Sequence, residues 1–410
     1  MAETISPTAA RPTMAVLVVV TMAAHLAMNI ILPSLPGIQA SYQTDYATVQ
    51  LTLTLFLVGI AVAQLIYGPL SDRFGRRPIV LAGLAILVVG TIICLLAPNI
   101  EALIAGRLVQ AVGGCAGMVM GRAMVRDLYD ANRAAQMIAY LTMAAVVAPT
   151  TAPLVGGILE EQFSWQASFV LILVASVGFL IFAYTSAHET LPSERRRDVR
   201  FGQLFQSFWV LLKNPLFNGY ACQVGFSTGA YFAFVGGTPY VAINLMGATP
   251  AILGGYFLLV TMFYIGGNFG TARLAERFGV SRMVTIGTLI SLTGAVAMLA
   301  VEMAFGLVPV TFFGIMSILA AGNGFCISAG TAAAISADPE RVGAASGLAG
   351  SMQIGFSAVS TFVAGLLLQY YVTTPMPLIL VMVGFCIMAV ISPVIGRRVA
   401  HAAATGGVQH

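Results

Sequence analysis

Long uninterrupted apolar runs constrain this chain more than any other feature of its sequence. A helix needs about 20 consecutive apolar residues to cross the hydrocarbon core of a bilayer, and we count twelve such runs. They are too long for transmembrane strands and show no period-2 alternation. We therefore expect an all-α membrane protein with twelve transmembrane helices, at residues 13–34, 48–70, 78–97, 100–124, 135–158, 165–187, 216–241, 251–273, 281–300, 306–334, 342–371 and 376–396.

The composition agrees with this and excludes several other classes of protein. Only 8% of the 410 residues are charged, whereas a soluble domain carries about 25%. The net charge of +4 comes from arginines in short loops, which does not indicate nucleic acid as a partner. The five cysteines lie singly inside apolar runs. We find no metal-ligand cluster, cofactor motif or catalytic pairing, so we expect no metal, no cofactor and no enzyme activity.

The positions of the arginines predict the orientation in the membrane. If the N-terminus is cytoplasmic, the outer loops hold no Lys or Arg and only acids, among them Glu160 and Glu161, as the positive-inside rule requires. An even number of spans then puts both termini in the cytoplasm. The first run lacks a cleavage signal and is expected to be a retained helix.

The longest polar break divides the chain into two halves. It covers residues 188–203 and is followed by an amphipathic, basic-ended segment expected to lie along the inner membrane surface. We expect an N-terminal six-helix bundle at 1–187, a cytoplasmic linker at 188–214 and a C-terminal six-helix bundle at 215–410. Nothing demands oligomerisation, so we expect a monomer.

The two halves carry a repeated loop motif. "GPLSDRFGRRP" (68–78) follows the second run and "ARLAERFGVSR" (272–282) follows the eighth. The tetrapeptide 72–75 thus matches the tetrapeptide 276–279 about half a chain later. A parallel six-plus-six repeat with a basic central loop is typical of transporters that work by alternating access.

These motifs resemble the major facilitator superfamily over nearly the whole chain. "GPLSDRFGRR" (68–77) is similar to its signature between helices two and three. "RLVQAVGG" (107–114) is similar to its second motif, and "APTTAPLVGG" (148–157) to the motif associated with its antiporters. The resemblance implies the fold of that superfamily, two pseudo-symmetric six-helix bundles.

Three further stretches narrow the resemblance. "LAMNIILPSLP" (26–36), "HETLP" (188–192) and "GGTPYV" (236–241) are similar to drug:proton antiporters of the bicyclomycin and chloramphenicol/florfenicol resistance group. The resemblance implies an exporter of the bacterial inner membrane that moves small amphipathic compounds, such as phenicols or bicyclomycin-like molecules, in exchange for protons.

The signature loop predicts a conformational latch. Its glycines allow a tight turn, and Asp72 is expected to pair with Arg122 or Arg126 at the inner end of helix four, which would favour the outward-facing state. Alternatively, the loop charges only fix the topology. The expected latch comprises Gly68, Asp72, Arg73, Gly75, Arg76, Arg77, Arg122 and Arg126.

The antiporter motif predicts a bendable seal between the halves. Pro149 and Pro153 each remove a backbone donor, so helix five is expected to be kinked. Gly156 and Gly157 permit close contact between helices. The alternative is ordinary transmembrane proline and glycine content.

Helix one lacks an acid that the resemblance leads us to expect. Exporters of this group carry a carboxylate at the position of Asn29, and none of the fifteen acids of this chain falls at mid-membrane by the spans above. His25 is then the deep side chain that titrates near neutral pH, and it shares a helix face with Asn29. We take His25 as the proton-coupling candidate. Polar packing, substrate binding and lipid contact are the alternatives.

The same reasoning predicts a central cavity. Arg107 lies about 10 Å into helix four, where a charge must face a cavity or a partner unless it snorkels to the interface. Gln110 follows one turn later. If His25, Asn29 and Arg107 meet, the site favours neutral or anionic substrates over cations. Aromatic and polar residues of the second half complete the expected cavity, although plain packing is the alternative for each: Tyr231, Phe234, Tyr256, Asn323 and Gln353.

The sequence thus predicts a secondary exporter that binds a small molecule and protons within the lipid bilayer. The rival is a metabolite exporter or facilitator with weak or no proton coupling, which the missing acid supports.

Overall fold

A computed structural model describes residues 14–196, 201–371 and 373–406. These residues are almost entirely helical, and the described part of the chain contains no strand. The helices are α1 (Met14–Asn29), α2 (Leu35–Tyr42), α3 (Tyr46–Phe74), α4 (Arg76–Leu95), α5 (Ile100–Leu128), α6 (Ala131–Gln162), α7 (Trp165–Ser186), α8 (Phe201–Lys213), α9 (Pro215–Pro239), α10 (Pro250–Phe278), α11 (Val280–Phe305), α12 (Pro309–Ser336), α13 (Val342–Tyr370) and α14 (Met376–Gly406). Short helical turns lie between them at η1 (Leu32–Ser34), η2 (Ser193–Arg195), η3 (Tyr240–Leu245) and η4 (Pro339–Arg341).

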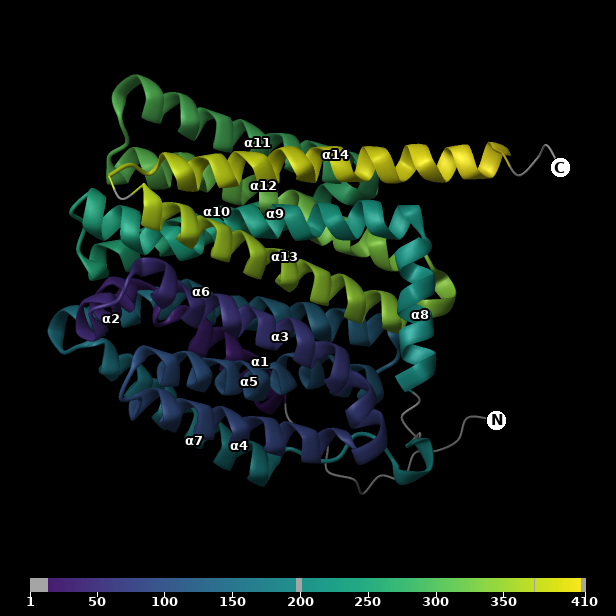
Figure 1. Ribbon diagram of the computed structural model, residues 1–410. Helices are drawn as coiled ribbons and strands as arrows, with labels where there is room; N and C mark the ends of the chain where they lie inside the picture. The colour runs from purple at the N-terminus through teal and green to yellow at the C-terminus, as the bar shows by residue number, and fades with distance from the viewer. Residues whose placement is uncertain (1–13, 197–200, 372, 407–410) are drawn as a thin grey trace.

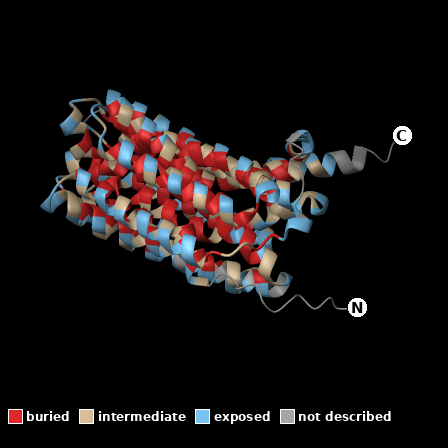
Figure 2. Cartoon of the chain, turned by 90° about the horizontal axis from the view of Figure 1, so that it is seen from below, coloured by how far each residue is buried: buried red, intermediate tan, exposed pale blue. Residues whose placement is uncertain are grey.

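The long helices lie side by side in two groups. Figure 1 shows α1 and α3 to α7 on one side of the molecule and α9 to α14 on the other. The groups meet where α3 packs on α13 and α6 packs on α10. Buried residues run along the interior of this bundle from end to end (Figure 2).

The prediction of membrane-spanning helices is confirmed, but the count of twelve is not reached. Within the described residues, eleven helices are long and apolar enough to cross a bilayer, with α1 to α2 counted as one span. The expected run 216–241 corresponds to α9 and is not among them. Its apolar stretch is interrupted by glycines and by polar residues such as Gln223 and Ser227.

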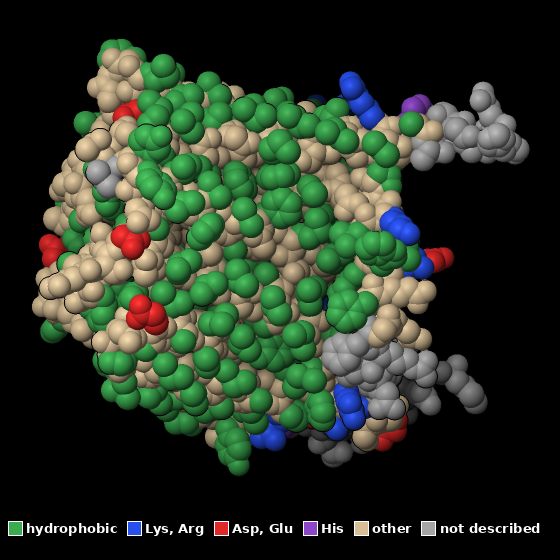
Figure 3. Space-filling view, viewed as in Figure 1, with side chains coloured by type: hydrophobic (Ala, Val, Ile, Leu, Met, Phe, Trp, Pro, Cys, Tyr) green, Lys and Arg blue, Asp and Glu red, His purple; other side chains and the backbone are tan. Residues whose placement is uncertain are grey.

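The surface of the bundle is built for an apolar surrounding. Figure 3 shows hydrophobic side chains over its flank. Across the described residues, apolar side chains such as Val62, Val174 and Ile181 are more than half exposed. An apolar surface this extensive marks contact with lipid rather than water. Figure 3 also shows that Lys and Arg gather toward the end where Figure 1 marks the chain termini. We call this the basic end and the opposite one, with Asp45 and Glu161, the acidic end.

The first span is broken near the acidic end. α1 stops at Asn29, η1 makes one tight turn, and α2 continues from Leu35. Pro33 and Pro36 explain the break, because neither has an N–H to donate to a carbonyl one turn earlier. The stretch between them therefore holds more backbone acceptors than donors.

The repeated loop motif has the same backbone structure in both halves. α3 and α10 are each 29 residues long, and each ends at a Phe followed by a glycine. Gly75 has φ 97° and Gly279 has φ 81°, and the next helix starts at the following residue. Only glycine adopts such a backbone without strain, which accounts for the glycine in both copies of the motif.

α8 lies across the ends of the other helices at the basic end (Figure 1). Its spacing of apolar residues creates two faces. Phe208 and Leu211 are buried, whereas Phe205 and Trp209 are exposed. The helix packs on α9 and α13 with the first face and presents aromatic side chains with the second.

Candidate functional site

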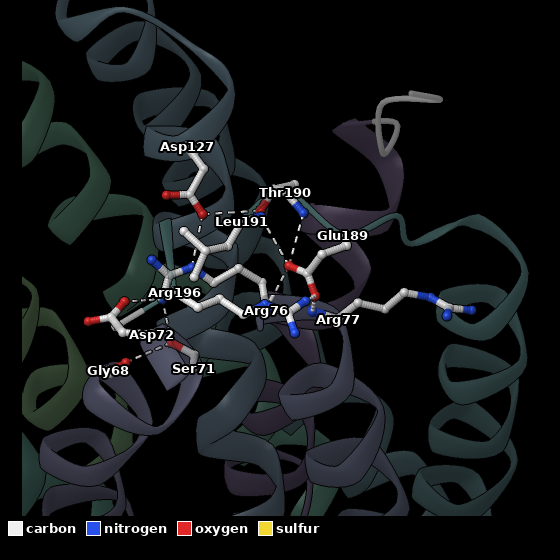
Figure 4. Close-up of polar contacts among 10 residues, drawn as sticks. All are labelled: Gly68, Ser71, Asp72, Arg76, Arg77, Asp127, Glu189, Thr190, Leu191 and Arg196. Carbon is white, nitrogen blue, oxygen red and sulfur yellow. Dashed lines mark hydrogen bonds and ion pairs between the residues drawn. The ribbon is translucent and has the colours of Figure 1, made fainter. Parts of the chain in front are cut away.

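An arginine at the start of α4 joins three helices at the basic end. Arg76 donates from Nε to Asp127 of α5 at 2.9 Å and from Nη1 to Asp72 of α3 at 2.6 Å, and it also bonds the hydroxyl of Ser71 (Figure 4). Its guanidinium is mostly buried between the two carboxylates. Such charge-assisted pairs hold the ends of α3, α4 and α5 together.

Glu189, in the segment after α7, caps the first turn of α4. Its carboxylate accepts from the backbone N–H of Arg76 at 2.8 Å and of Arg77 at 3.3 Å. It also accepts from the N–H groups of Thr190 and Leu191, at 3.1 and 3.0 Å. Because Gly75 has no side chain to cap this helix, a negative group from elsewhere satisfies its free donors. This gives the "HETLP" stretch a structural role.

In this structure Asp72 has a different partner from the one expected. Asp72 pairs with Arg76, which lies one turn further along the chain, and not with Arg122 or Arg126. The residue of α5 that joins this network is the acid Asp127. The other members of the expected latch have local contacts: the Gly68 carbonyl accepts from Ser71, Arg73 lies over Phe74, and Arg77 donates to the Tyr184 carbonyl.

Arg107 does not face an open cavity in this structure. It is 0% exposed. Nη1 donates to the Ala27 carbonyl of α1 at 2.9 Å, and the side chain also bonds Gln110. The guanidinium lies 4.2 Å from the ring centroid of Phe56 on α3, so backbone acceptors and an aromatic face hold the charge in the interior.

Gln110 is likewise part of a buried network. It is 0% exposed and donates from Nε2 to Thr91 of α4 at 2.8 Å. Arg107 and Gln110 therefore connect α5 to its neighbours in the first half. The expected cavity surface at these two residues is absent in this conformation.

His25 and Asn29 lie on α1 but do not meet Arg107. Successive residues on a helix turn by about 100°, so the Ala27 carbonyl that binds Arg107 belongs to a different side of α1. His25 Nδ1 lies 3.1 Å from the Thr21 carbonyl, and Asn29 donates to the His25 carbonyl at 2.7 Å. A carbonyl only accepts, so Nδ1 carries the proton and Nε2 is left free.

Arg122 is the cation near His25. It is exposed although it sits well inside α5, and its guanidinium acts electrostatically on the imidazole of His25. Its neighbour Gly121 packs against the Thr21 hydroxyl of α1, which brings this part of α5 to the His25 face. The sequence analysis expected Arg107 to be the cation beside His25, whereas in this structure the cation that acts on His25 is Arg122.

The second-half residues divide into packed and accessible ones. Phe234 and Asn323 are 0% exposed. Phe234 lies among Phe257, Phe312 and Phe313. Asn323 donates to the Ser227 carbonyl at 3.0 Å. Both are core residues in this conformation, which corrects their expected exposure to a cavity.

Three second-half candidates keep accessible surface. Tyr231, Tyr256 and Gln353 are half-buried. Tyr256 stacks on Phe313 at 4.4 Å between ring centroids, and Gln353 donates to the Thr228 hydroxyl at 3.1 Å. Each of them thus combines partial exposure with contacts to its neighbours.

The glycines of the antiporter motif lie at a junction of three segments near the acidic end. A Cβ on Gly156 would coincide with the Ile30 carbonyl, at the break of the first span. A Cβ on Gly157 would coincide with the Pro250 carbonyl, at the start of α10 in the second half. α6, which contains Pro149 and Pro153, therefore touches both neighbours backbone to backbone.

Further contacts close the acidic end between the halves. The Tyr46 hydroxyl of α3 donates to the Gly236 carbonyl of α9 at 2.6 Å, and its ring lies 4.9 Å from that of Tyr240. Gln50, one turn after Tyr46, fills the space beside Gly236 and Gly365. The sequence analysis missed both α3 residues, because a Tyr and a Gln at a helix start carry no distinctive signal.

The chain is similar to known transporters over most of its length. A sequence model of the Major Facilitator Superfamily matches residues 17–361. The uncharacterized MFS-type transporter YdgK of Bacillus subtilis (strain 168) is 30% identical, and the match covers 83% of this chain and 85% of that protein. The bicyclomycin resistance protein homolog of Haemophilus influenzae is 28% identical, covering 90% of this chain and 92% of that protein.

A solved structure shares the fold. The crystal structure of a bacterial homolog of the human lysosomal transporter Spinster, in an inward-facing and unoccupied conformation, has a TM-score of 0.71 to this chain. The two are 15% identical, and the match covers 93% of this chain and 95% of that one.

Proposed function

This chain belongs to the major facilitator superfamily, and from that premise we propose that it is a secondary active exporter of small amphipathic compounds in the bacterial inner membrane. It works as a monomer with twelve spans. Its two six-helix halves, 1–187 and 215–410, are joined by the cytoplasmic linker 188–214 and rock around a central site. The similarity to a bicyclomycin resistance protein homolog supports drug-like substrates.

The observation that carries the proposal is the asymmetry between the two ends. The acidic end is closed by contacts between the halves at Tyr46 and Gly157, whereas Arg122 and His25 keep accessible surface. With the basic end in the cytoplasm, as the positive-inside rule favours, the site loads from inside. An exporter requires this direction of loading.

The charges of the site favour neutral or anionic substrates. Asn29 occupies the position of the acid in helix one, and Arg122 supplies a positive charge beside His25. A cationic drug would meet like charge without a compensating carboxylate. Phenicols and bicyclomycin-like molecules carry hydroxyl and amide groups that suit an imidazole and an arginine.

His25 provides a route to proton antiport. Its Nδ1 is engaged by the Thr21 carbonyl, so Nε2 is the atom that accepts either a proton or a hydrogen bond from a substrate hydroxyl. Because both need the same lone pair, they compete. Mutually exclusive binding at one atom is the requirement for exchange.

The second candidate function is a metabolite exporter or facilitator with weak or no proton coupling. The specific observation in its favour is Asn29, which cannot titrate. In this version His25 hydrogen-bonds the substrate but carries no proton across the membrane.

A drug-panel susceptibility test in an efflux-deficient host separates the two. We expect expression of the chain to raise resistance to chloramphenicol more than to ethidium, and a proton uncoupler to abolish the gain. Uptake of labelled compound that is equal with and without an imposed pH gradient favours the facilitator, because a carrier without proton coupling only equilibrates its substrate. The absence of any change in susceptibility across the panel contradicts drug export.

A further inference from the structure

A carboxylate near the acidic end lies against the break in the first span. Glu160 is one turn after Gly156 on α6, so both face the same way. A Cβ on Gly37 of α2 would coincide with Glu160 Oε1, which means that the carboxylate occupies the space that this glycine leaves open. The spans counted from sequence ended α6 at residue 158 and left Glu160 in a loop, but α6 continues to Gln162.

This carboxylate lacks the hydrogen bonds that an ionised group requires. Its Oε2 is buried and has no partner. Ser34 of η1 is 0% exposed, and its hydroxyl acts on Glu160 as a donor but forms no hydrogen bond of normal geometry. A buried carboxylate without such hydrogen bonds is unfavourable when charged. A protonated carboxyl is itself a donor and suits the acceptor-rich break between Pro33 and Pro36.

Within the described part of the chain, α5 included, no charged side chain acts on Glu160. On α6 itself, Glu161 is exposed. Residues 30–42 contribute only Tyr42, which donates to the Ala97 carbonyl. The first turns of α10 contribute Tyr256, which stacks on Phe313. On α1, His25 is nine residues before Ser34, about 13 Å along the span. The start of α7 (165–170) carries no titratable group of an acid or base.

We propose that Glu160 is the proton-binding site of a gate at the acidic end. It holds a proton while α6, the break of the first span and α10 are packed together, and it gives the proton up to the outer solution when they separate and water reaches it. Each closure of the acidic end binds one proton, and each opening releases it. Low external pH thus favours the closed end.

This goes beyond the proposed export of drugs. In an exporter it would let an acidic exterior shift the empty carrier toward the inward-facing state, with the proton taken from and returned to the outer solution. It does not require His25 to titrate, and it does not depend on which compound is carried. A test without substrate therefore decides it separately from the proposed function.

The test measures the distance across the gate by double electron–electron resonance on the full chain in nanodiscs. Spin labels go on Ala40→Cys of α2 and Asn244→Cys of η3, both exposed and on opposite halves, with the five native cysteines replaced by alanine. A single linked proton changes the ratio of closed to open forms by up to about tenfold per pH unit. We expect the fraction of molecules with the long label-to-label distance, which are open at the acidic end, to increase as the pH is raised from about 5 to 8.

The decisive variant is Glu160→Gln, with Glu161→Gln as the matched control. Glutamine keeps the shape but stays neutral, so we expect the short distance at every pH, whereas the control follows the unmodified protein. A pH response that survives in Glu160→Gln assigns the gate to another group and overturns the proposal. So does the absence of any pH response in the unmodified protein.

Gly37→Ala provides a second measurement. The new methyl group displaces the carboxylate from its pocket toward water, so we expect the midpoint of opening to move to lower pH. A midpoint equal to that of the unmodified protein would contradict the proposed contact.

Discussion

Arg107 on α5 donates a hydrogen bond of 2.9 Å to the backbone carbonyl of Ala27 on α1. This bond makes a charged side chain part of the interior of the first half. Because its acceptor is a backbone carbonyl, no second substitution at Ala27 can compensate for the loss of Arg107. A lysine at this position would supply a point charge but not the planar guanidinium that also reaches Gln110.

Replacement of Arg107 should therefore lower stability as well as transport. Arg107→Ala leaves the Gln110 oxygen and the Ala27 carbonyl without a donor, at about 1–3 kcal/mol each. We expect both Arg107→Ala and Arg107→Lys to melt at lower temperature in detergent. Arg73→Ala, at an exposed arginine, is the control. An unchanged melting temperature for Arg107→Lys would argue against a structural role.

Replacement of His25 should remove proton drive and spare the carrier. In proteoliposomes loaded with chloramphenicol, we expect His25→Ala to lose uptake or release driven by a pH gradient. Exchange of labelled for unlabelled chloramphenicol at equal pH should continue, because it moves no net proton. Gradient-driven transport at the unmodified rate would rule out His25 as the proton carrier.

Arg122 should select substrates by charge. Since its guanidinium is exposed beside His25, Arg122→Gln is expected to weaken transport of an anionic substrate by tenfold or more while neutral chloramphenicol changes less; one lost charge-assisted hydrogen bond is worth about 1.5–3 kcal/mol. Arg122→Lys serves as the control that keeps the charge. Equal losses for both substrates would mean that Arg122 acts on folding or gating.

Gly156 should not tolerate even alanine. The added Cβ would overlap the Ile30 carbonyl, which is backbone and cannot rotate away. We expect Gly156→Ala to lose transport and to open the acidic end in the spin-label measurement. Gly178 of α7 has nothing within 4 Å of its Cβ position, so Gly178→Ala is the matched control. Normal transport by Gly156→Ala would show that the contact with Ile30 accommodates a methyl group and would contradict this prediction.

Glu189 should matter more than its place between the two halves suggests. It accepts from two backbone N–H groups at the start of α4 and from two in its own segment, those of Thr190 and Leu191. Loss of a helix cap costs about 0.5–2 kcal/mol of stability, and we therefore expect Glu189→Ala to melt at a lower temperature than the unmodified protein. Glu194→Ala, exposed on the same segment, should have no effect. A similar drop in both would point to the net charge of the segment instead.

The sequence predicts the spans and the repeat because both are local patterns. Apolar runs of bilayer length leave helices as the only outcome, and the two "RFG" turns require glycine at Gly75 and Gly279 wherever the rest of the chain goes. The contacts of a polar side chain depend instead on which face of which neighbour it meets. On α1, Ala27 lies on a different side of the helix from His25 and Asn29. Arg107 binds on the Ala27 side and therefore does not meet the two polar residues.

Errors of a few residues in the predicted helix ends changed which side chains were expected to meet. Extending α6 by four residues beyond the expected span moves Glu160 from a loop into contact with Gly37 and Ser34. Similarly, the acid of α5 that binds Arg76 is Asp127, one residue after the arginine proposed as a partner. Hydropathy cannot resolve a single residue at such boundaries.

The network around Arg76 has a consequence for how salt acts on this protein. All of its ion-pair partners lie on α3 and α5, within the half that moves as one unit if the halves rock. No charge pair of this network breaks when the carrier turns to the other side. Because the Arg76 guanidinium is mostly buried, added electrolyte screens this network only weakly, and the ratio of inward-facing to outward-facing molecules is expected not to change with salt through it.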